Sequence, residues 1–441
     1  MVVRIAIHAT VLLIAWGVYW VAFFPGVVGF DSIGQWRQIV TGRYNDWHPA
    51  FHTGVVWLLT RPGHSFASMS LVQVLVASLL VACFLSTCRD LGAPRWLICV
   101  ALAWLALAPV FAMNVITVWK DTAFALAVMW MTLLVLRALA RETVGLAAAG
   151  WLGLAGALAC LFRHNGAAVV LPTFAAFAWW FRHRAPRALA VAAAVCLLAV
   201  WIVKGPAYRA AHVRRVPRAL PYQTLIHEVG AFVATGTPLT AEERAFLERA
   251  LPLSTWRATY ACASGNALMR SGMQPDALLH DPFSLPVLWV RLALRDPWTL
   301  LHHWSCATRF VWSPRSDLSV ACDVTPNPFG IAARPLVPGA ERLLAGVVRA
   351  TLVPDSLLRV LVWQPALPLY AVLAALAASL RRARSTTPVL VFLPALCNTL
   401  VWLVLPFAPD SRFQWPVTLF APVALCLAAL DWRRVGGAAG A

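Results

Sequence analysis

Residues 24–53 read FPGVVGFDSIGQWRQIVTGRYNDWHPAFHT and follow directly after the first long apolar segment. They hold several ionisable side chains in a sequence of which only 12% is charged. The spacing of residues 32–40 predicts an amphipathic helix that lies in the headgroup layer of a membrane, with Asp31 at its N-terminal end. Its expected apolar face carries Ile33, Trp36 and Val40, and its polar face carries Gln35, Arg37 and Gln38.

The composition of the 441 residues is that of a membrane protein. Hydrophobic residues make up 61% of the sequence, and the mean hydropathy is +0.72. Many apolar runs are long enough to cross a bilayer, which predicts an all-α polytopic membrane protein. The net charge of +18 fits arginine-rich cytoplasmic loops and contacts with anionic membrane lipids. No basic block stands in a soluble module, so we expect no nucleic-acid partner.

Ten apolar runs are candidates for transmembrane helices. They are residues 3–24, 70–87, 96–113, 121–138, 146–162, 166–181, 188–203, 357–380, 388–407 and 413–430. With this count the arginines of the short loops fall on one side, which identifies the cytoplasm and places both termini there. The outer side then receives the first external loop, the turns near residues 114–121, 163–166 and 409–412, and the segment 204–356.

This count divides the chain into three parts. A seven-span module covers 1–203 and includes the first external loop at 24–69, an external segment covers 204–356, and a three-span module covers 357–441. We expect the external segment to be mostly helical and to cover the site, with a helix opening at the capping box of Thr240 and Glu243. Residues 285–313 carry too many charges for an ordinary span and predict a helix pair lying on the membrane, with a reentrant or two-pass arrangement left open.

Three of the ten cysteines fall in the external segment, namely Cys262, Cys306 and Cys322. An oxidising outer compartment would allow one disulfide among them, and the pairing of Cys306 with Cys322 is one option. The other cysteines lie in apolar runs and are expected to be small buried hydrophobes. No CxxC pair is present, so the cysteines do not predict a metal site.

Two acidic residues open predicted helices at the same depth on the outer side. Asp31 precedes the interfacial helix, and Asp121 follows Lys120 at the outer start of the fourth span. Each could act only as a helix cap, with the lysine reaching the headgroups. Together they could deprotonate an acceptor hydroxyl or hold a divalent cation, Mg²⁺ or Mn²⁺, against a phosphate. We place both in a candidate catalytic site with His48, whose alternative role is to shape the turn before Pro49.

Three further basic residues stand in outer turns. Arg163 and His164 interrupt the hairpin between the fifth and sixth spans, and Arg412 precedes the last span. A guanidinium group suits a phosphate because its donors are arranged as a fork. Interfacial anchoring is the alternative. The sequence shows neither a glycine-rich phosphate loop nor a Ser-His-Asp spacing, so we do not expect a cytosolic nucleotide bound in a soluble domain.

With these residues in place, the chain resembles the GT-C superfamily of integral-membrane glycosyltransferases. The likeness rests on a first span, a long external loop with an interfacial helix, and an acid in each of the first two external loops. A bacterial branch of that superfamily has a similar signature over spans 1–7, and the likeness over 204–441 is loose. The matching residues here are Pro25-Gly26, Asp31-Ser32, Gln35, His48-Pro49, Lys120-Asp121 and Arg163-His164-Asn165-Gly166.

The resemblance implies a GT-C fold and an inverting transferase at the outer face of the bacterial cytoplasmic membrane. A polyprenyl-phosphate-linked sugar would be the donor, and a lipid, a glycan or a protein would be the acceptor. Asp31 would be the catalytic acid position, assisted by Asp121, which could also help to hold a metal. The donor phosphate would be bound by Lys120, Arg163, His164 and Arg412. A lysine stands where some relatives carry a second acid, and it could neutralise the phosphate in place of a metal.

Two other function classes compete with this interpretation. A transporter or flippase for a lipid-linked saccharide would use the same charged residues to line a path. The charges gather at one surface, however, and no half of the chain is duplicated, which favours the transferase. In a membrane-bound assembly subunit, the two acids would be helix caps alone.

Overall fold

The computed structural model describes residues 1–61, 65–279, 281, 284–432 and 435. Over these residues the chain is helical, and its extended backbone pairs only at three isolated bridges, Val27 with Thr117, Asn45 with Arg214, and Ser319 with Asp410. The chain forms two compact units. The larger contains residues 1–214, 320–399 and 411–441, and the smaller contains 215–319 and 400–410. The expected external segment 204–356 is therefore divided between the two units.

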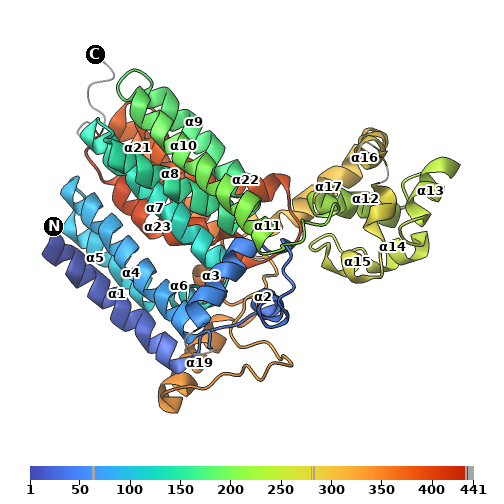
Figure 1. Ribbon diagram of the computed structural model, residues 1–441, viewed down its shortest axis with the longest axis horizontal. Coiled ribbons are helices and arrows are strands. Elements are labelled where there is room, and N and C mark those ends of the chain that lie inside the picture. The colour runs from blue at the N-terminus through green and yellow to red at the C-terminus, as the bar shows by residue number, and fades with distance from the viewer. Residues whose placement is uncertain (62–64, 280, 282–283, 433–434, 436–441) are drawn as a thin grey trace. The chain divides into compact units, whose positions relative to one another are not determined.

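Long helices form most of the larger unit, and Figure 1 shows several of them side by side. The helix pairs with the most extensive contact are α8 with α10, α1 with α4, α7 with α8, and α21 with α23. Their bounds are α1 Val2–Ala22, α4 Ala67–Asp90, α5 Arg95–Leu107, α6 Pro109–Ile116, α7 Lys120–Arg141, α8 Leu146–Phe162, α9 Gly166–Phe181, α10 Pro186–Ile202, α21 Ala366–Ala383, α22 Thr387–Val404 and α23 Trp415–Ala428.

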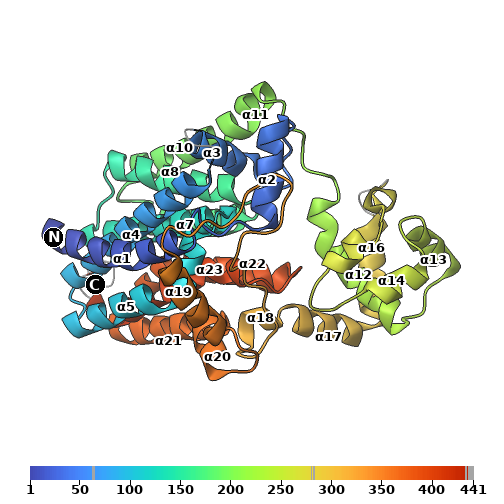
Figure 2. The same ribbon diagram turned by 90° about the horizontal axis from the view of Figure 1, so that it is seen from below.

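Shorter helices lie around this bundle. Figure 2 shows α2, α3 and α11 grouped at one end of the long helices. The shorter elements are α2 Phe30–Thr41, α3 Ala50–Thr60, the π-helical turn Val203–Ala207, α11 Tyr208–Ala210, α19 Pro338–Thr351, α20 Leu357–Trp363 and the 3₁₀ turn Ser411–Gln414. Both α2 and α3 come from residues 24–69, the predicted first external loop.

Among the residues that the structure describes, six helices are long and apolar enough to cross a membrane, which agrees with a polytopic helical membrane protein. They are α1, α4, α7, the continuous helix Pro186–Ala210, α21 and α22. A seventh span exists if α5 and α6, which meet at an angle of 58°, are counted as one. The predicted number of ten is not confirmed. The predicted spans 146–162 and 166–181 are helices, but α8 and α9 have only 17 and 16 residues.

Prolines explain where two of the predicted spans break. The residue before a proline is driven out of the helical region by the proline ring. Ala108 and Gln364 both take extended backbone before Pro109 and Pro365, with ψ of 121° and 119°. The first break separates α5 from α6 within the predicted run 96–113. The second makes the predicted run 357–380 begin as a span only at Ala366.

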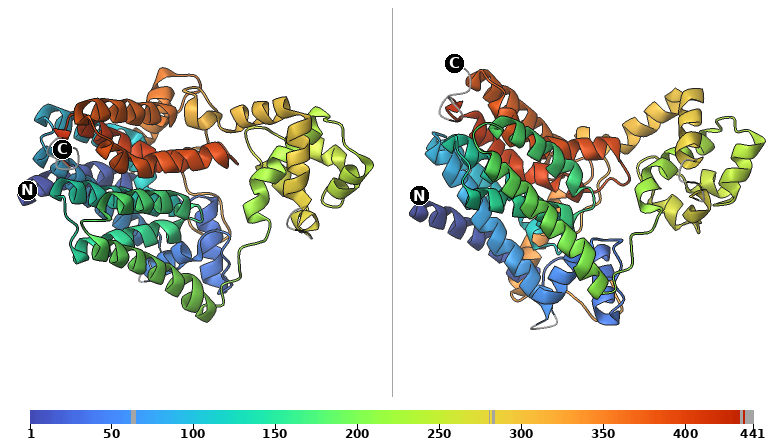
Figure 3. Two further views of the ribbon diagram at one scale, coloured as in Figure 1. Left: turned by 90° about the horizontal axis from the view of Figure 1, so that it is seen from above. Right: turned by 45° about the horizontal axis from the view of Figure 1, so that its top comes forward.

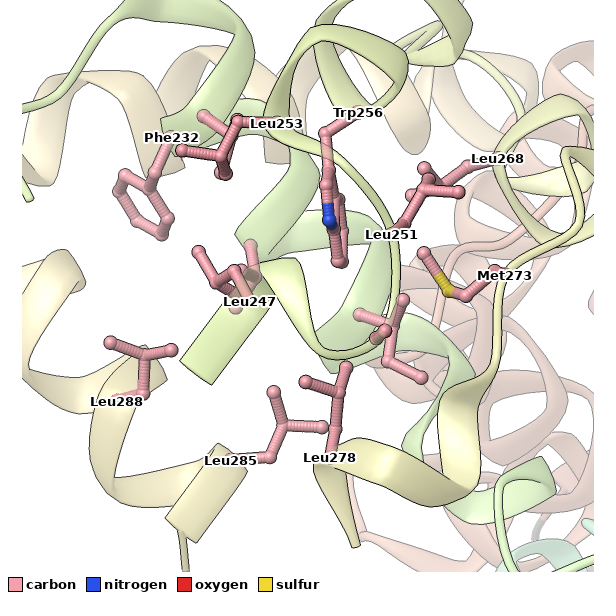
Figure 4. Close-up of a cluster of buried hydrophobic side chains, with 14 of the residues drawn as sticks. Phe232, Leu247, Leu251, Leu253, Trp256, Leu268, Met273, Leu278, Leu285 and Leu288 are labelled. Atoms are coloured by element: carbon pink, nitrogen blue, oxygen red, sulfur yellow. The ribbon is translucent and has the colours of Figure 1, made fainter. Parts of the chain in front are cut away.

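The smaller unit consists of short helices, which Figure 3 shows in green, yellow and light orange. They are α12 Gln223–Thr235, α13 Ala241–Glu248, α14 Leu253–Thr259, α15 Asn266–Arg270, α16 Ser284–Arg295, α17 Pro297–Ala307 and α18 Arg309–Trp312. Figure 4 shows the side chains of its core converging, among them Phe232, Leu247, Trp256 and Leu285. This core of leucines and aromatic rings holds the short helices together.

Two predictions of helical structure in this unit are confirmed, and the position of 285–313 on a membrane stays a prediction. Thr240 and Glu243 form the expected capping box at the start of α13. The predicted helix pair in 285–313 is present as α16 and α17, which are too short to be candidate spans. They are separated at Asp296, which precedes Pro297 and caps α17 by accepting a hydrogen bond from Thr299 N at 3.1 Å.

The disulfide joins Cys262 to Cys306, so the suggested pairing of Cys306 with Cys322 is wrong. The fold brings residues 260–262 beside α17, where Tyr260 OH lies 2.7 Å from His303 Nδ1. The Cα atoms of the bonded cysteines are 5.9 Å apart. Cys322 is a free, half-buried thiol. Proximity in sequence favoured the wrong partner, because the contact between the 260–262 segment and α17 forms only in the folded unit.

The predicted faces of α2 are partly wrong. Ile33 and Trp36 are buried against Phe66 and Val118, as expected. Val40, however, is 58% exposed, whereas Gln35 is buried. The glutamine can be buried because its amide exchanges hydrogen bonds with neighbours on α3, donating to Thr53 Oγ1 at 3.1 Å and lying 3.0 Å from His52 Nδ1. Gln35 and Gln38 of the predicted polar face are thus packed inside the protein, whereas Arg37 is exposed as expected.

Glu228 in α12 provides a test of the smaller unit's stability. Burial raises the pKa of this carboxyl group from 4.5 to about 7, so the folded state holds its proton more tightly than the unfolded chain. The contribution of Glu228 to the free energy of unfolding therefore falls as pH rises from 4.5 to about 7. Above that range the buried carboxylate has lowered the free energy of unfolding by roughly 3 kcal/mol. We predict that Glu228→Gln raises the unfolding temperature at about pH 8.5 and changes it much less at about pH 5.

Glu248 is exposed, so Glu248→Gln is the matched control and should leave the unfolding temperature unchanged at both pH values. Thermal unfolding of the purified full chain measures the effect. An equal gain for Glu228→Gln at both pH values would contradict the account, because it would then not arise from ionisation.

Candidate functional site

A short extended pairing brings the first turns of α2 and α7 together. Val27 N donates to Ile116 O at 3.3 Å, and Val118 N donates to Val27 O at 2.9 Å. Gly26 permits this close approach, since its φ is +110° and a Cβ there would lie 2.7 Å from Ile116 O. α2 and α7 both begin within a few residues of the pairing. Acidic side chains in their first turns must therefore lie near one another.

Asp31 is held by two cations. Its Oδ2 accepts hydrogen bonds from Lys120 Nζ at 2.6 Å and from Arg412 Nη1 at 2.7 Å. Its Oδ1 faces His48 Nε2 at 3.6 Å. The residue that caps α2 is Gly29, and Asp31 makes no capping hydrogen bond. The alternative that Asp31 serves only as a helix cap is therefore wrong.

Asp121 is more deeply buried and pairs with a different cation. Its side chain is 1% exposed, and its Oδ1 forms an ion pair with Arg163. Arg163 is fixed by the rings of Phe124 and Phe413, whose centroids lie 5.7 and 5.2 Å from its Cζ. Its Nε donates to Asn165 Oδ1 at 3.0 Å. Arg163 is thus committed to holding Asp121 in place.

Lys120 and Arg412 lie between the two carboxylates. Besides their bonds to Asp31, they approach Asp121 Oδ2 at 3.7 and 3.8 Å. Arg412 also stacks on the ring of Trp119, with its Cζ 4.8 Å from the centroid. Three cations, counting Arg163, face two carboxylates, so the cluster carries one excess positive charge. An excess positive charge in a low-dielectric site favours an anionic ligand.

The charges around Asp31 fix its protonation state and that of His48. Burial alone would raise the pKa of Asp31, but Lys120 and Arg412 outweigh burial and hold this pKa well below its usual value. Burial and then the charge of Lys120 lower the pKa of His48 to about 3. At neutral pH the site therefore holds an ionised carboxylate beside a neutral imidazole.

His164 stands apart from the ion cluster. Its Nε2 lies 2.8 Å from the backbone oxygen of Asp46. The Asp46 carboxylate turns away to accept a hydrogen bond from Ala50 N at 2.8 Å. His164 thus fixes the loop that carries His48. Of the seven predicted site residues, His164 is the one whose contacts lie outside the cluster.

Sequence reasoning missed several residues that shape the site. Trp119 directly precedes Lys120, and its ring supports Arg412. Phe413 contacts both Arg163 and Arg412, at 5.2 and 5.3 Å from its ring centroid. Aromatic residues directly beside the predicted cations were the available signal, because guanidinium groups stack on aromatic rings. In a chain this rich in tryptophan and phenylalanine, that signal has little specificity.

The donor set does not fit a divalent metal held by Asp31 and Asp121. Lys120 Nζ and Arg412 Nη1 already occupy the space between their Oδ2 atoms, where such an ion would have to bind both. No group of three or more His, Cys, Asp or Glu residues is placed to share an ion within the described part of the chain. The positive charge between the two carboxylates comes from Lys120 and Arg412.

The four segments that build the site come from distant parts of the sequence. They are the predicted first external loop at 24–69, the start of α7, the turn between α8 and α9, and the 3₁₀ turn before α23. The arginine pattern placed all four on one side of the membrane, and in the structure they meet. The opposite ends of the helices carry the ion pair of Arg4 with Asp90 at 2.7 Å. Comparison of the chain with protein-family profiles, curated proteins and solved structures gave no match.

The ion pair of Asp121 and Arg163 generates a stability prediction. We expect Asp121→Ala and Arg163→Ala each to lower the free energy of unfolding by about 3–5 kcal/mol, because each leaves the partner charge buried and unpaired. The double variant should lose clearly less than the sum of the two. Unfolding of the four proteins in one detergent measures this cycle.

The control cycle uses the exposed pair of Arg4 and Asp90, for which we expect a coupling below about 1 kcal/mol. Additive losses for Asp121→Ala and Arg163→Ala would contradict the account, since the two side chains would then not depend on each other.

Proposed function

We propose that this chain is a membrane glycosyltransferase of the GT-C type. It would move a sugar from a polyprenyl-phosphate donor to a lipid, glycan or protein acceptor at the outer face of the bacterial cytoplasmic membrane. The observation that carries the proposal is the ionised carboxylate of Asp31, held by Lys120 and Arg412 in a cluster with excess positive charge. A base and a phosphate site thus share the same two cations.

Lys120 and Arg412 are better placed than Arg163 to bind the donor phosphate. Their side chains are 12% and 16% exposed, and both contact Asp31, whose side chain is 20% exposed. Arg163 is enclosed by two aromatic rings and paired with Asp121. An incoming phosphate would compete with Asp31 for the two cations. Loss of those bonds would raise the pKa of Asp31 and make it a stronger base.

The reaction would then run as a single displacement at the anomeric carbon. The acceptor oxygen forms a bond to that carbon while the bond from the carbon to the donor phosphate oxygen breaks. The acceptor proton passes to Asp31, and the electron pair of the broken bond stays on the polyprenyl phosphate. The leaving phosphate gains one negative charge, which Lys120 and Arg412 stabilise. Attack from the face opposite the leaving group inverts the configuration.

His48 and Asp121 would support this step without taking the proton. His48 is neutral, and its Nε2 lies 3.6 Å from Asp31 Oδ1, so it can hydrogen bond to an acceptor hydroxyl placed beside the carboxylate. Asp121 would act as a positioning residue, because it holds Arg163 and faces Lys120 and Arg412.

A transporter of lipid-linked saccharides is the second candidate. The observation that favours it is the break between α5 and α6, which are bent by 58° at Ala108, because broken spans are typical of transporter binding sites. The charged residues, however, gather at the ends of helices. A carboxylate held ready beside two phosphate-binding cations has a direct use in group transfer and a less direct use in transport.

Sugar transfer in membranes from radiolabelled polyprenyl-phosphate donors tests the proposal. We expect the wild-type chain to label a membrane or cell-wall acceptor, and Asp31→Asn to lose about 10³-fold or more of this activity because the amide cannot accept the proton. Asp121→Asn should lose most of the activity as well. Asp90→Asn is the matched control and should keep it, since Asp90 forms an exposed ion pair with Arg4.

The outcome of the same assay distinguishes the two candidates. Full transfer by Asp31→Asn in folded protein would refute the proposed role of the carboxylate. If the wild-type chain binds lipid-linked sugar and moves it across vesicles but forms no glycosidic bond with any donor of a broad panel, the transporter is favoured and the transferase is wrong.

Metal removal gives a separate prediction. If Lys120 neutralises the phosphate, excess EDTA should leave transfer unchanged, whereas Lys120→Met should lower it by about 10²-fold or more. Lys204→Met is the matched control, because Lys204 is the other lysine in the sequence and is exposed. Loss of transfer in EDTA with recovery on adding Mg²⁺ or Mn²⁺ would contradict the interpretation of the donor set.

A further inference from the structure

A recess of about 420 Å³ lies on the side of α2 that leads to His48. The lining residues that matter here are Arg37, Gln38, Arg43, Asn45, Trp47 and His48. All of them belong to α2 or to the turn that follows it. The recess thus lies next to the ion cluster, since His48 borders both.

The recess is a built feature of the loop. Gly42 ends α2 in the left-handed region, with φ of +65°, and reverses the chain. Gln38 Oε1 then accepts a hydrogen bond from Asn45 N at 2.8 Å. Asn45 Oδ1 accepts one from Trp47 N at 3.1 Å. These bonds fasten the turn to the helix and leave a hollow between them.

The lining carries positive charge without a matching acid. Arg37 and Arg43 are exposed, and neither guanidinium has an ion-pair partner within the described part of the chain. Asp46, the acid closest to Arg43 in sequence, is buried and directed elsewhere, toward Ala50 N and Tyr208. A ligand with a carboxylate or phosphate group would find two unopposed guanidinium groups here.

The other groups in the lining suit a sugar. Trp47 is 38% exposed, and an indole ring can cover the apolar face of a pyranose. Asn45 is half-buried and carries an amide group of the kind that binds sugar hydroxyls. At the inner end, His48 Nε2 lies 3.6 Å from Asp31 Oδ1, so a hydroxyl that passes His48 reaches the proposed base.

We propose that this recess binds the acceptor of the transfer reaction and that the acceptor is an anionic saccharide. Its carboxylate or phosphate group binds Arg37 and Arg43, one of its rings stacks on Trp47, and its reactive hydroxyl passes His48 toward Asp31. The identification of this ligand as the acceptor rests on the proposed transferase function. The recognition of an anionic saccharide rests on the recess alone.

Equilibrium binding tests the recognition of an anionic saccharide separately from the transferase function. The purified chain in nanodiscs of neutral lipid is titrated with a uronate-containing disaccharide and with the same disaccharide reduced to its neutral form. We expect the anionic form to bind at least about tenfold more tightly to the wild-type chain. Arg37→Gln/Arg43→Gln should remove this preference, whereas the exposed Arg61→Gln should keep it. Arg37 and Arg43 are both exposed in the wild-type chain, so replacing them should not disturb folding.

Each other result overturns the proposal. Equal affinity for the two disaccharides, or a preference that survives in Arg37→Gln/Arg43→Gln, shows that the recess does not select an anionic saccharide. Binding of vesicles containing anionic phospholipid that depends on the two arginines, with no preference between the disaccharides, assigns the recess to lipid headgroups. The binding measurement needs no sugar transfer, so a negative transferase assay does not affect it. A negative binding result, in turn, leaves the transferase proposal standing.

Discussion

The contacts of Asp31 with Lys120 and Arg412 are the interaction on which the rest of the larger unit depends. They join residues 89 and 381 positions apart in the sequence. A charge buried near a membrane is costly unless a partner neutralises it, so each of these side chains requires the others. The pairing of Val27 with Thr117 brings two of the segments together, and Arg412 adds the turn that precedes α23. The ion cluster thus fixes how distant helices meet.

The same arrangement explains why the site can be both stable and reactive. Asp121 and Arg163 satisfy each other deep in the protein, enclosed by aromatic rings. Asp31 instead pairs with Lys120 and Arg412, whose side chains are partly exposed, so solvent and ligands can reach them. A ligand phosphate can therefore replace a carboxylate as their partner without leaving either cation unpaired. In the proposed mechanism the donor phosphate controls the basicity of Asp31. The recess beside α2 selects the acceptor whose hydroxyl is deprotonated.

Much of the site could be predicted because charge is rare in this sequence. Asp31, His48, Lys120, Asp121, Arg163 and Arg412 stood out against apolar runs, and the structure brings them together. Which cation pairs with which acid was not predictable, because that depends on side-chain packing around Phe124 and Phe413. The exposure of Val40 and the burial of Gln35 were missed for a related reason. Hydropathy assumes that amides face water, whereas Gln35 finds its partners on α3.

The central claim is that a donor phosphate takes Lys120 and Arg412 from Asp31. The most direct test is an experimental structure of the chain in nanodiscs with polyprenyl phosphate bound. The account predicts that the phosphate oxygens contact both cations and that Lys120 Nζ moves beyond hydrogen-bond distance from Asp31 Oδ2, which lies 2.6 Å away without ligand. A phosphate bound elsewhere, or one bound with both contacts of Asp31 unchanged, would contradict it.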